Sequence, residues 1–290
     1  MLNEGLESIG MFCFTESALE QIDVPRSVRH IGDGAFSGCT ALRQVRFEGS
    51  ALEDIGTEAF KESGLESFTA PASLCRIYAK AFAQCRSLRR VDLGACLLRP
   101  SGKENKDAFL YDNAFADSGM EDIRLPRALR VIGEQVFRDC RSLKRISFDA
   151  DAATEEIGAR AFQGSGLESF VAPPALRRIG VMAFSGCRDL RTFQLNEEIQ
   201  EVGWLCLQTA GVPELQLPPQ AGKTREQLGL DQRDPKVLRL PDGLEEVGDR
   251  LFWGSEIERL VVPSSVRKFG EYAFSCCKQL REVVFLFDYD

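Results

Sequence analysis

Apolar and polar positions along the chain follow one pattern, which mostly returns every 22 to 25 residues. Each unit contains a hexapeptide of the form I-G-x-x-A-F, and its last residue is aromatic in all but one copy. These last residues stand at positions 14, 36, 60, 82, 115, 137, 162, 184, 207, 252 and 274. Because self-similarity at a period of roughly 20 to 50 residues is typical of repeat architectures, the pattern predicts a solenoid of about twelve stacked units.

A short stretch of alternating residues follows each hexapeptide and has the form L-x-x-V-x-F/L. Examples are LRQVRF at 42–47 and LKRISF at 143–148. Alternation with a period of two predicts a strand with one buried face. A proline often comes next, and proline ends a ladder because it has no N–H to donate. We interpret the Ala-Phe segment before the strand as a short helical turn that fills the core with phenylalanine.

Two segments interrupt the period. A polar, loop-like insertion lies near residues 97–109, and a degenerate repeat that has lost its phenylalanine lies near residues 218–240. The gap of 45 residues around the degenerate repeat equals two periods, so the register continues across it. We therefore treat residues 1–290 as a single solenoid domain.

The spacing and signature resemble the BspA-type branch of the leucine-rich repeats. The resemblance covers nearly the whole chain and rests on eleven copies of one motif, such as IGDGAF at 31–36 and IGARAF at 157–162. It implies an α/β fold: a right-handed leucine-rich-repeat solenoid with one parallel strand and one short helical turn per repeat. It also implies protein binding, adhesion or surface display rather than catalysis.

Two kinds of unit alternate, so the full period is a pair of units. One kind carries cysteine three residues after the phenylalanine, as at Cys39 and Cys85. The other kind carries Ser-Gly-Leu or a relative at the same place, as at residues 63–65 and 165–167. We call them Cys-type and Ser-Gly-type units.

Charged residues beside the predicted strands follow the same alternation. After the leading leucine, Cys-type units place basic residues such as Arg43, whereas Ser-Gly-type units place acidic residues such as Glu66. A second ladder immediately before I-G alternates similarly, with Arg29 followed by Glu53. In a stacked parallel sheet these charges would face each other, stabilise the fold by about 0.2–1 kcal/mol per pair and set its register. A ligand-binding surface is the alternative interpretation.

Composition and charge narrow the range of partners. Lys and Arg number 36 against 44 Asp and Glu, which gives a net charge of −8. We expect no nucleic-acid partner, because affinity for nucleic acid comes from neutralising phosphates. We also expect no membrane insertion, because no apolar run is long enough to span a bilayer. The first residues lack the features of a signal peptide, so we expect an intracellular location. Surface exposure is the alternative if the chain is a piece of a longer exported protein.

The residue types that carry chemistry have structural explanations. The single histidine, His30, occupies a place that holds Asp54 or Arg76 in other units, so we interpret it as a solvated ladder residue. The ten cysteines lack the close spacings of zinc sites, and like-placed cysteines would stand too far apart for disulfides. We interpret them as small, free, buried thiols. We therefore expect no catalytic residue, no cofactor and no metal site, and no enzymatic activity.

Departures from the repeat mark the candidate binding site. The two residues after I-G are usually polar or small, but become Val181-Met182 and then Trp204-Leu205 in consecutive units. Two units later Trp253 occupies the place after the phenylalanine, which is usually polar. Exposed apolar clusters rich in tryptophan are typical of binding hot spots. Alternatively, the irregular segment 218–235 folds back over these residues. The insertion near 97–109 is a second candidate, with a tolerated surface loop as its alternative.

The ends of the array carry no polar capping unit, which solenoids usually need. The last predicted strand would expose Val283, Phe285 and Phe287, and an exposed strand edge invites pairing. The main hypothesis is a non-catalytic scaffold that binds another protein or protein complex. The alternative is a structural subunit, or a fragment of a surface adhesin, that docks through its uncapped ends, with end-to-end self-association as one form.

Overall fold

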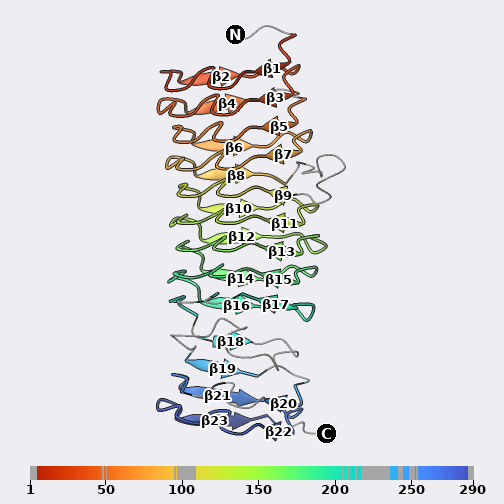
Figure 1. Ribbon diagram of the computed structural model, residues 1–290, viewed down its shortest axis with the longest axis vertical. Helices are drawn as coiled ribbons and strands as arrows, with labels where there is room; N and C mark the ends of the chain where they lie inside the picture. Colours follow the sequence, from red (N-terminus) through yellow and green to blue (C-terminus); the bar gives the residue numbers. More distant parts are fainter. Residues whose placement is uncertain are drawn as a thin grey trace.

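The computed structural model describes residues 5–47, 49, 51–94, 96, 109–203, 206–207, 209–212, 214–216, 236–240, 244–247, 252 and 254–286. In this part of the chain the backbone forms a parallel β-solenoid whose coils follow one another along the long axis of the molecule (Figure 1). Each regular coil carries two short strands, which form two columns along that axis (Figure 1).

The first column consists of two-residue strands that end on the first residue of the hexapeptide. They are β1 (Ser8–Ile9), β3 (His30–Ile31), β5 (Asp54–Ile55), β7 (Arg76–Ile77), β9 (Phe109–Leu110), β11 (Val131–Ile132), β13 (Glu156–Ile157), β15 (Arg178–Ile179), β17 (Glu201–Val202), β20 (Glu246–Val247) and β22 (Lys268–Phe269). Those from β1 to β17 form one nine-stranded sheet, and β20 pairs with β22.

The second column consists of the strands that the alternating stretches predict. They are β2 (Gln21–Asp23), β4 (Gln44–Arg46), β6 (Ser67–Thr69), β8 (Arg90–Asp92), β10 (Asp122–Arg124), β12 (Arg145–Ser147), β14 (Ser169–Val171), β16 (Thr192–Gln194), β18 (Glu214–Gln216), β19 (Val237–Arg239), β21 (Arg259–Val262) and β23 (Glu282–Phe285). They form three parallel sheets: β2-β4, β6-β8-β10-β12 and β14-β16-β18-β19-β21-β23.

The expectation of one strand per repeat is therefore wrong, because the regular coils of the described residues contain two. A strand of two residues is too short to show alternation in the sequence, so its only signal was the charge ladder before I-G. The count of about twelve repeats stays a prediction, since much of the degenerate repeat near 218–240 lies outside the described residues.

The predicted helical turn is also wrong, since the described residues contain no helix. Alternate backbone N–H groups in the turn bond to the next coil: Gly34 N donates to Thr57 O at 2.8 Å, and Phe36 N donates to Ala59 O at 2.7 Å. A helix would use these donors internally and leave the turns of neighbouring coils without hydrogen bonds between them. The described chain is thus a parallel β-solenoid, not an α/β fold.

Left-handed residues make this alternation possible. Positive φ recurs at two places in the turn. One is the fourth residue of the hexapeptide, such as Glu58 at 55° and Lys80 at 56°, and the other is the second residue after the phenylalanine, such as Glu62. A left-handed conformation costs an L-residue about 1–2 kcal/mol. The inter-coil hydrogen bonds that it permits offset that cost in each coil.

A column of stacked phenylalanine rings fills the core beneath the turns. Phe36 and Phe60 have ring centroids 5.1 Å apart and planes 5° apart. Successive centroids lie 5.1–5.9 Å apart along the whole series Phe14, Phe36, Phe60, Phe82, Phe115, Phe137, Phe162 and Phe184. The predicted role of the motif's phenylalanine as a core residue is confirmed, and this place holds ten of the 20 phenylalanines in the chain.

The alternation of Cys-type and Ser-Gly-type units is a hydrogen-bonding pattern between coils. Ser63 Oγ lies 3.3 Å from Cys85 Sγ, which also donates to the carbonyl oxygen of Phe60 at 2.9 Å. The same pair recurs at Ser118–Cys140 and Ser165–Cys187. Each Cys-type coil is thereby tied to the Ser-Gly-type coil before it.

All ten cysteines are free, as expected. Their predicted burial holds for Cys39, Cys75, Cys85, Cys96, Cys140, Cys187, Cys206 and Cys277, which are buried or half-buried. It is wrong for Cys13 and Cys276, which are exposed. Both lie in the outermost described coils, where no further coil covers the turn.

The glycine of the Ser-Gly-type units permits close approach between coils. A Cβ atom on Gly119 would collide with the carbonyl oxygen of Arg86 in the coil before it. Gly64 and Gly166 stand in the same relation to Thr40 and Arg141. Because the obstacle is backbone, the clash cannot be relieved by moving a side chain.

We expect Gly119→Ala to lower the free energy of unfolding by about 1–3 kcal/mol, the usual cost of inserting an atom into a packed core. Gly94→Ala is the matched control, because the nearest atom to its Cβ would be the side-chain Oδ1 of Asp92 at 3.3 Å. Urea unfolding followed by circular dichroism measures both. Equal losses in the two variants would show that the coils do not need glycine at this place.

Candidate functional site

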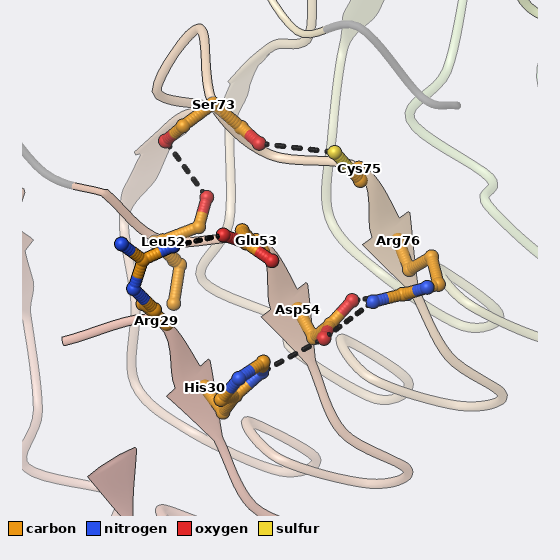
Figure 2. Close-up of polar contacts among 8 residues, drawn as sticks. All are labelled: Arg29, His30, Leu52, Glu53, Asp54, Ser73, Cys75 and Arg76. Carbon is orange, nitrogen blue, oxygen red and sulfur yellow. Dashed lines mark hydrogen bonds and ion pairs between the residues drawn. The ribbon is translucent and has the colours of Figure 1, made fainter. Parts of the chain in front are cut away.

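The single histidine lies in a row of ion pairs on the first column of strands. Asp54 of β5 stands between His30 of β3 and Arg76 of β7 (Figure 2). Its Oδ2 lies 2.8 Å from His30 Nδ1 and accepts a bond from Arg76 Nη2 at 2.7 Å. The hydrogen bond from Arg76 to Asp54 raises the pKa of the guanidinium above its ordinary value. Asp54 is thus held by both neighbours, and the ladder role predicted for His30 is confirmed.

Ser8 of β1 is the register partner of His30, but among the described residues no hydrogen bond joins His30 to a serine or cysteine side chain. Ser73 Oγ donates to the carbonyl oxygen of Leu52 at 2.8 Å, and Cys75 Sγ donates to the carbonyl oxygen of Ser73 at 3.2 Å. Figure 2 shows both hydroxyl and thiol on the coil beyond Asp54, away from His30. The serine or cysteine and histidine arrangement of a hydrolase does not form here.

Opposite charges face each other at many further steps of the array, as the alternation predicts. Arg29 meets Glu53 at 2.6 Å, which Figure 2 also shows, and Arg178 meets Glu156 at 2.6 Å. In the second column the pairs are looser, as between Lys144 and Glu168. Pairs that are exposed to this degree contribute about 0–1 kcal/mol each, so their main effect is on register.

The predicted apolar binding patch is only partly within the described residues. Val181 is 43% exposed in the turn between β15 and β16, and Met182 beside it is half-buried with a left-handed φ of 57°. Trp204, Leu205 and Trp253 lie outside the described residues, as do the segment 218–235 and residues 97–108 of the insertion. The patch and the insertion therefore stay predictions.

Both edges of the described array expose apolar side chains. On β23, Val283 is 43% exposed and Phe285 51% exposed, as the sequence predicts, whereas Phe287 lies outside the described residues. At the opposite edge Met11 is 62% and Phe12 61% exposed, and these two were not predicted. Their signal was present, because the same places hold small or polar residues in most inner coils.

One surface feature was not predicted from the sequence at all. A hollow of ≈ 680 Å³ lies over four successive turns, from the coil of Lys61 to the coil of Arg138, and basic side chains surround it. The residues that line it are spread over 81 positions, from Lys61 to Arg141. Only the stacking of coils brings them to one place.

The described residues contain no group of three or more His, Cys, Asp or Glu that could hold a metal ion. Nor does this part of the chain contain a helix long and apolar enough to cross a membrane.

Comparison with known proteins matches the repeat along almost the entire chain. A family model for the BspA-type leucine-rich repeat region matches in six copies, over residues 1–95, 109–227 and 234–288. A leucine-rich repeat protein from Bacteroides ovatus is similar in structure, at 26% identity and a TM-score of 0.67, over 97% of this chain and 77% of that one. The pneumococcal vaccine antigen PcpA shares the fold at 18% identity and a TM-score of 0.51, over 96% of this chain and 84% of its own. No curated protein matches significantly, and the matches indicate no catalytic family.

Burial makes four of the thiols unreactive. It raises the pKa of Cys85 and Cys140 to about 11 and that of Cys187 and Cys206 to about 12. At pH 8 we expect iodoacetamide to alkylate the exposed Cys13 and Cys276 and to spare these four, because the reactive thiolate is absent and shielded. Peptide mass spectrometry measures the sites, with a urea-unfolded sample as the control. Uniform labelling of the folded chain would contradict the described packing.

The same shift gives a pH dependence of stability. Since folding raises the pKa of Cys85 from 9.0 to about 11, the native state binds more protons than the unfolded state between these two pH values. The stabilisation is present below about pH 9 and is lost as the pH rises through about 11. The midpoint of urea unfolding should fall over that range.

Proposed function

The chain belongs to the BspA-type leucine-rich repeat family, and from this we propose that it is a non-catalytic scaffold that binds another protein. The observation that supports the proposal is that reactive side chains of the chain are used in contacts between coils. The thiols of Cys85 and Cys140 bond to the preceding coil, and Asp54 is held between His30 and Arg76. What remains on the surface is rows of side chains on a rigid backbone.

Rows of this kind suit protein recognition. Successive coils present equivalent side chains about 4.8 Å apart, so the array offers an extended surface of regular spacing. A partner that contacts several coils gains from contacts whose geometry is fixed in advance, because little ordering is needed on binding. The match to a leucine-rich repeat protein of B. ovatus supports the same class of function.

The proposed binding patch comprises Val181, Met182, Trp204, Leu205 and Trp253. The exposure of Val181 supports it, since inner coils place small or polar side chains there. Tryptophan supplies a large contact area at low entropic cost, which is why it is enriched at hot spots.

We expect Trp204→Ser combined with Trp253→Ser to weaken partner binding by at least about tenfold, the effect of losing a hot spot. Immobilised wild type and variant are incubated with an extract of the source cells, and the proteins retained are quantified by mass spectrometry. Val171→Ser is the matched control, because it removes an exposed apolar side chain from β14 instead. If the tryptophan double variant and the Val171→Ser control retain a partner equally, the binding site lies elsewhere.

The second candidate is a structural subunit that stacks through its edges, and one observation favours it. The first described coil carries Glu7 and Glu20 and is of the Ser-Gly type, whereas the last carries Lys268 and Arg281 and is of the Cys type. Stacking the last coil of one copy on the first coil of another would continue both alternations. Such a head-to-tail contact would be heterologous and would extend without closing.

If this contact forms, the mass from light scattering should rise with protein concentration, and more so at low salt. Glu7→Lys combined with Glu20→Lys should abolish the rise by placing like charges at the contact. Glu66→Lys is a control for charge alone, since Glu66 is exposed in an inner coil. A constant monomer mass up to about 0.1 mM would count against stacking, because weak contacts of about 10 μM would be seen there.

A further inference from the structure

The hollow over the turns exists because two coils carry a smaller residue than their neighbours. The place immediately after the core phenylalanine holds Lys61 and Arg138 in the outer two coils, but Ala83 and Ala116 in the two between. The long side chains form two ends of the hollow and the alanines form its floor. Three coil steps of about 4.8 Å separate the ends by about 14 Å.

The rim of the hollow is positively charged. Five of its lining side chains are basic and two are acidic, an excess of three positive charges. They are Lys61, Lys80, Arg86, Arg138 and Arg141, against Asp117 and Asp139. The chain as a whole carries a net charge of −8, so this local reversal favours an anionic ligand.

Most of the basic side chains are ion-paired, but each pair is in contact with solvent. Lys61 and Lys80 both meet Glu58, at 3.3 and 3.4 Å, with 28% and 51% of their side chains exposed. Arg86 meets Asp117 at 2.8 Å with 75% of its side chain exposed, and Arg138 meets Asp139 at 3.1 Å. Pairs this exposed contribute about 0–1 kcal/mol, so an incoming carboxylate can replace them at little cost. Arg141 is exposed and has no ion-pair partner among the described residues.

We infer that this hollow, lined by Lys61, Ala83, Ala116 and Arg138, binds an extended acidic segment of a partner protein. An extended chain rises about 3.3 Å per residue, so carboxylates four residues apart stand about 13 Å apart on one face. That spacing matches the separation of Lys61 and Arg138. The inference rests on the proposed scaffold function and gives that scaffold a partner chemistry.

The two carboxylates of the hollow favour a peptide over a dense polyanion. Asp117 and Asp139 would repel the closely spaced charges of a nucleic acid or a sulfated glycan. A peptide with widely spaced carboxylates avoids them, and its backbone N–H groups can donate to them. The apolar floor of Ala83 and Ala116 likewise suits the methylene groups of glutamate side chains.

The test uses a fluorescein-labelled peptide of four Glu-Gly-Ser-Gly repeats, which places glutamate at every fourth residue. Fluorescence anisotropy measures its dissociation constant from the full chain at low salt. We expect Lys61→Ser combined with Arg138→Ser to weaken binding at least about tenfold. Serine occupies the same place at Ser37 and Ser185, so the coils accept it.

Two further variants separate the hollow from general charge. Arg90→Ser combined with Arg145→Ser removes two cations from strands β8 and β12, where Ser67 of β6 shows that serine fits, and should leave binding within about twofold. Ala116→Gln fills the floor without changing the charge, as Gln163 does in another coil, and should weaken binding severalfold. Circular dichroism and unfolding midpoints confirm that each variant is folded.

The inference would be overturned by equal loss in both double variants, by an unchanged affinity in Ala116→Gln, or by no binding of the peptide by wild type. Tighter binding of a sulfated oligosaccharide or an oligothymidylate at about 0.15 M salt would overturn it in favour of a polyanion site. Failure here leaves the scaffold function standing if the tryptophan variants still lose a cellular partner. Failure here, together with capture of no partner by wild type, would count against the scaffold function as well.

Discussion

The structure depends on the backbone hydrogen bonds that link each turn to the next coil. Phe36 N donates to Ala59 O, and alternate residues of the turn repeat this bond from coil to coil. The bonds require left-handed residues such as Glu58, at a cost of about 1–2 kcal/mol each, and they hold the turns at a constant separation. The phenylalanine rings stack at that separation, so the core and the turn stabilise each other.

This constraint decides which side chains are free to act. Small polar groups near the turn, such as Ser63 and Cys85, become bonds between coils, and glycines such as Gly119 let one coil approach the carbonyl groups of another. Charged residues of neighbouring strands compensate each other at many steps, as Asp54 and Arg76 do. The chemistry of the chain is largely used to align its coils, which agrees with a family whose matches indicate no catalytic activity.

Function in such an array arises from departures at individual places in an otherwise constant frame. Exchanging a long residue for alanine at two successive coils opens a hollow between Lys61 and Arg138 without altering the backbone. Placing Val181 where other coils hold polar residues creates an apolar projection by the same means. The frame tolerates these changes because the turn surface contributes little to the phenylalanine core.

The sequence by itself determined the repeat, the family, the phenylalanine core and the alternation of charges, because each is a local pattern repeated many times. Only the tertiary structure decided that the Ala-Phe turn is not helical, since the acceptors for Gly34 and Phe36 lie on another coil. It also decided that two residues such as Asp54–Ile55 form a strand, which is too short to show a pattern. The hollow was beyond the sequence for the same reason: Lys61 and Arg138 become neighbours only when the coils stack.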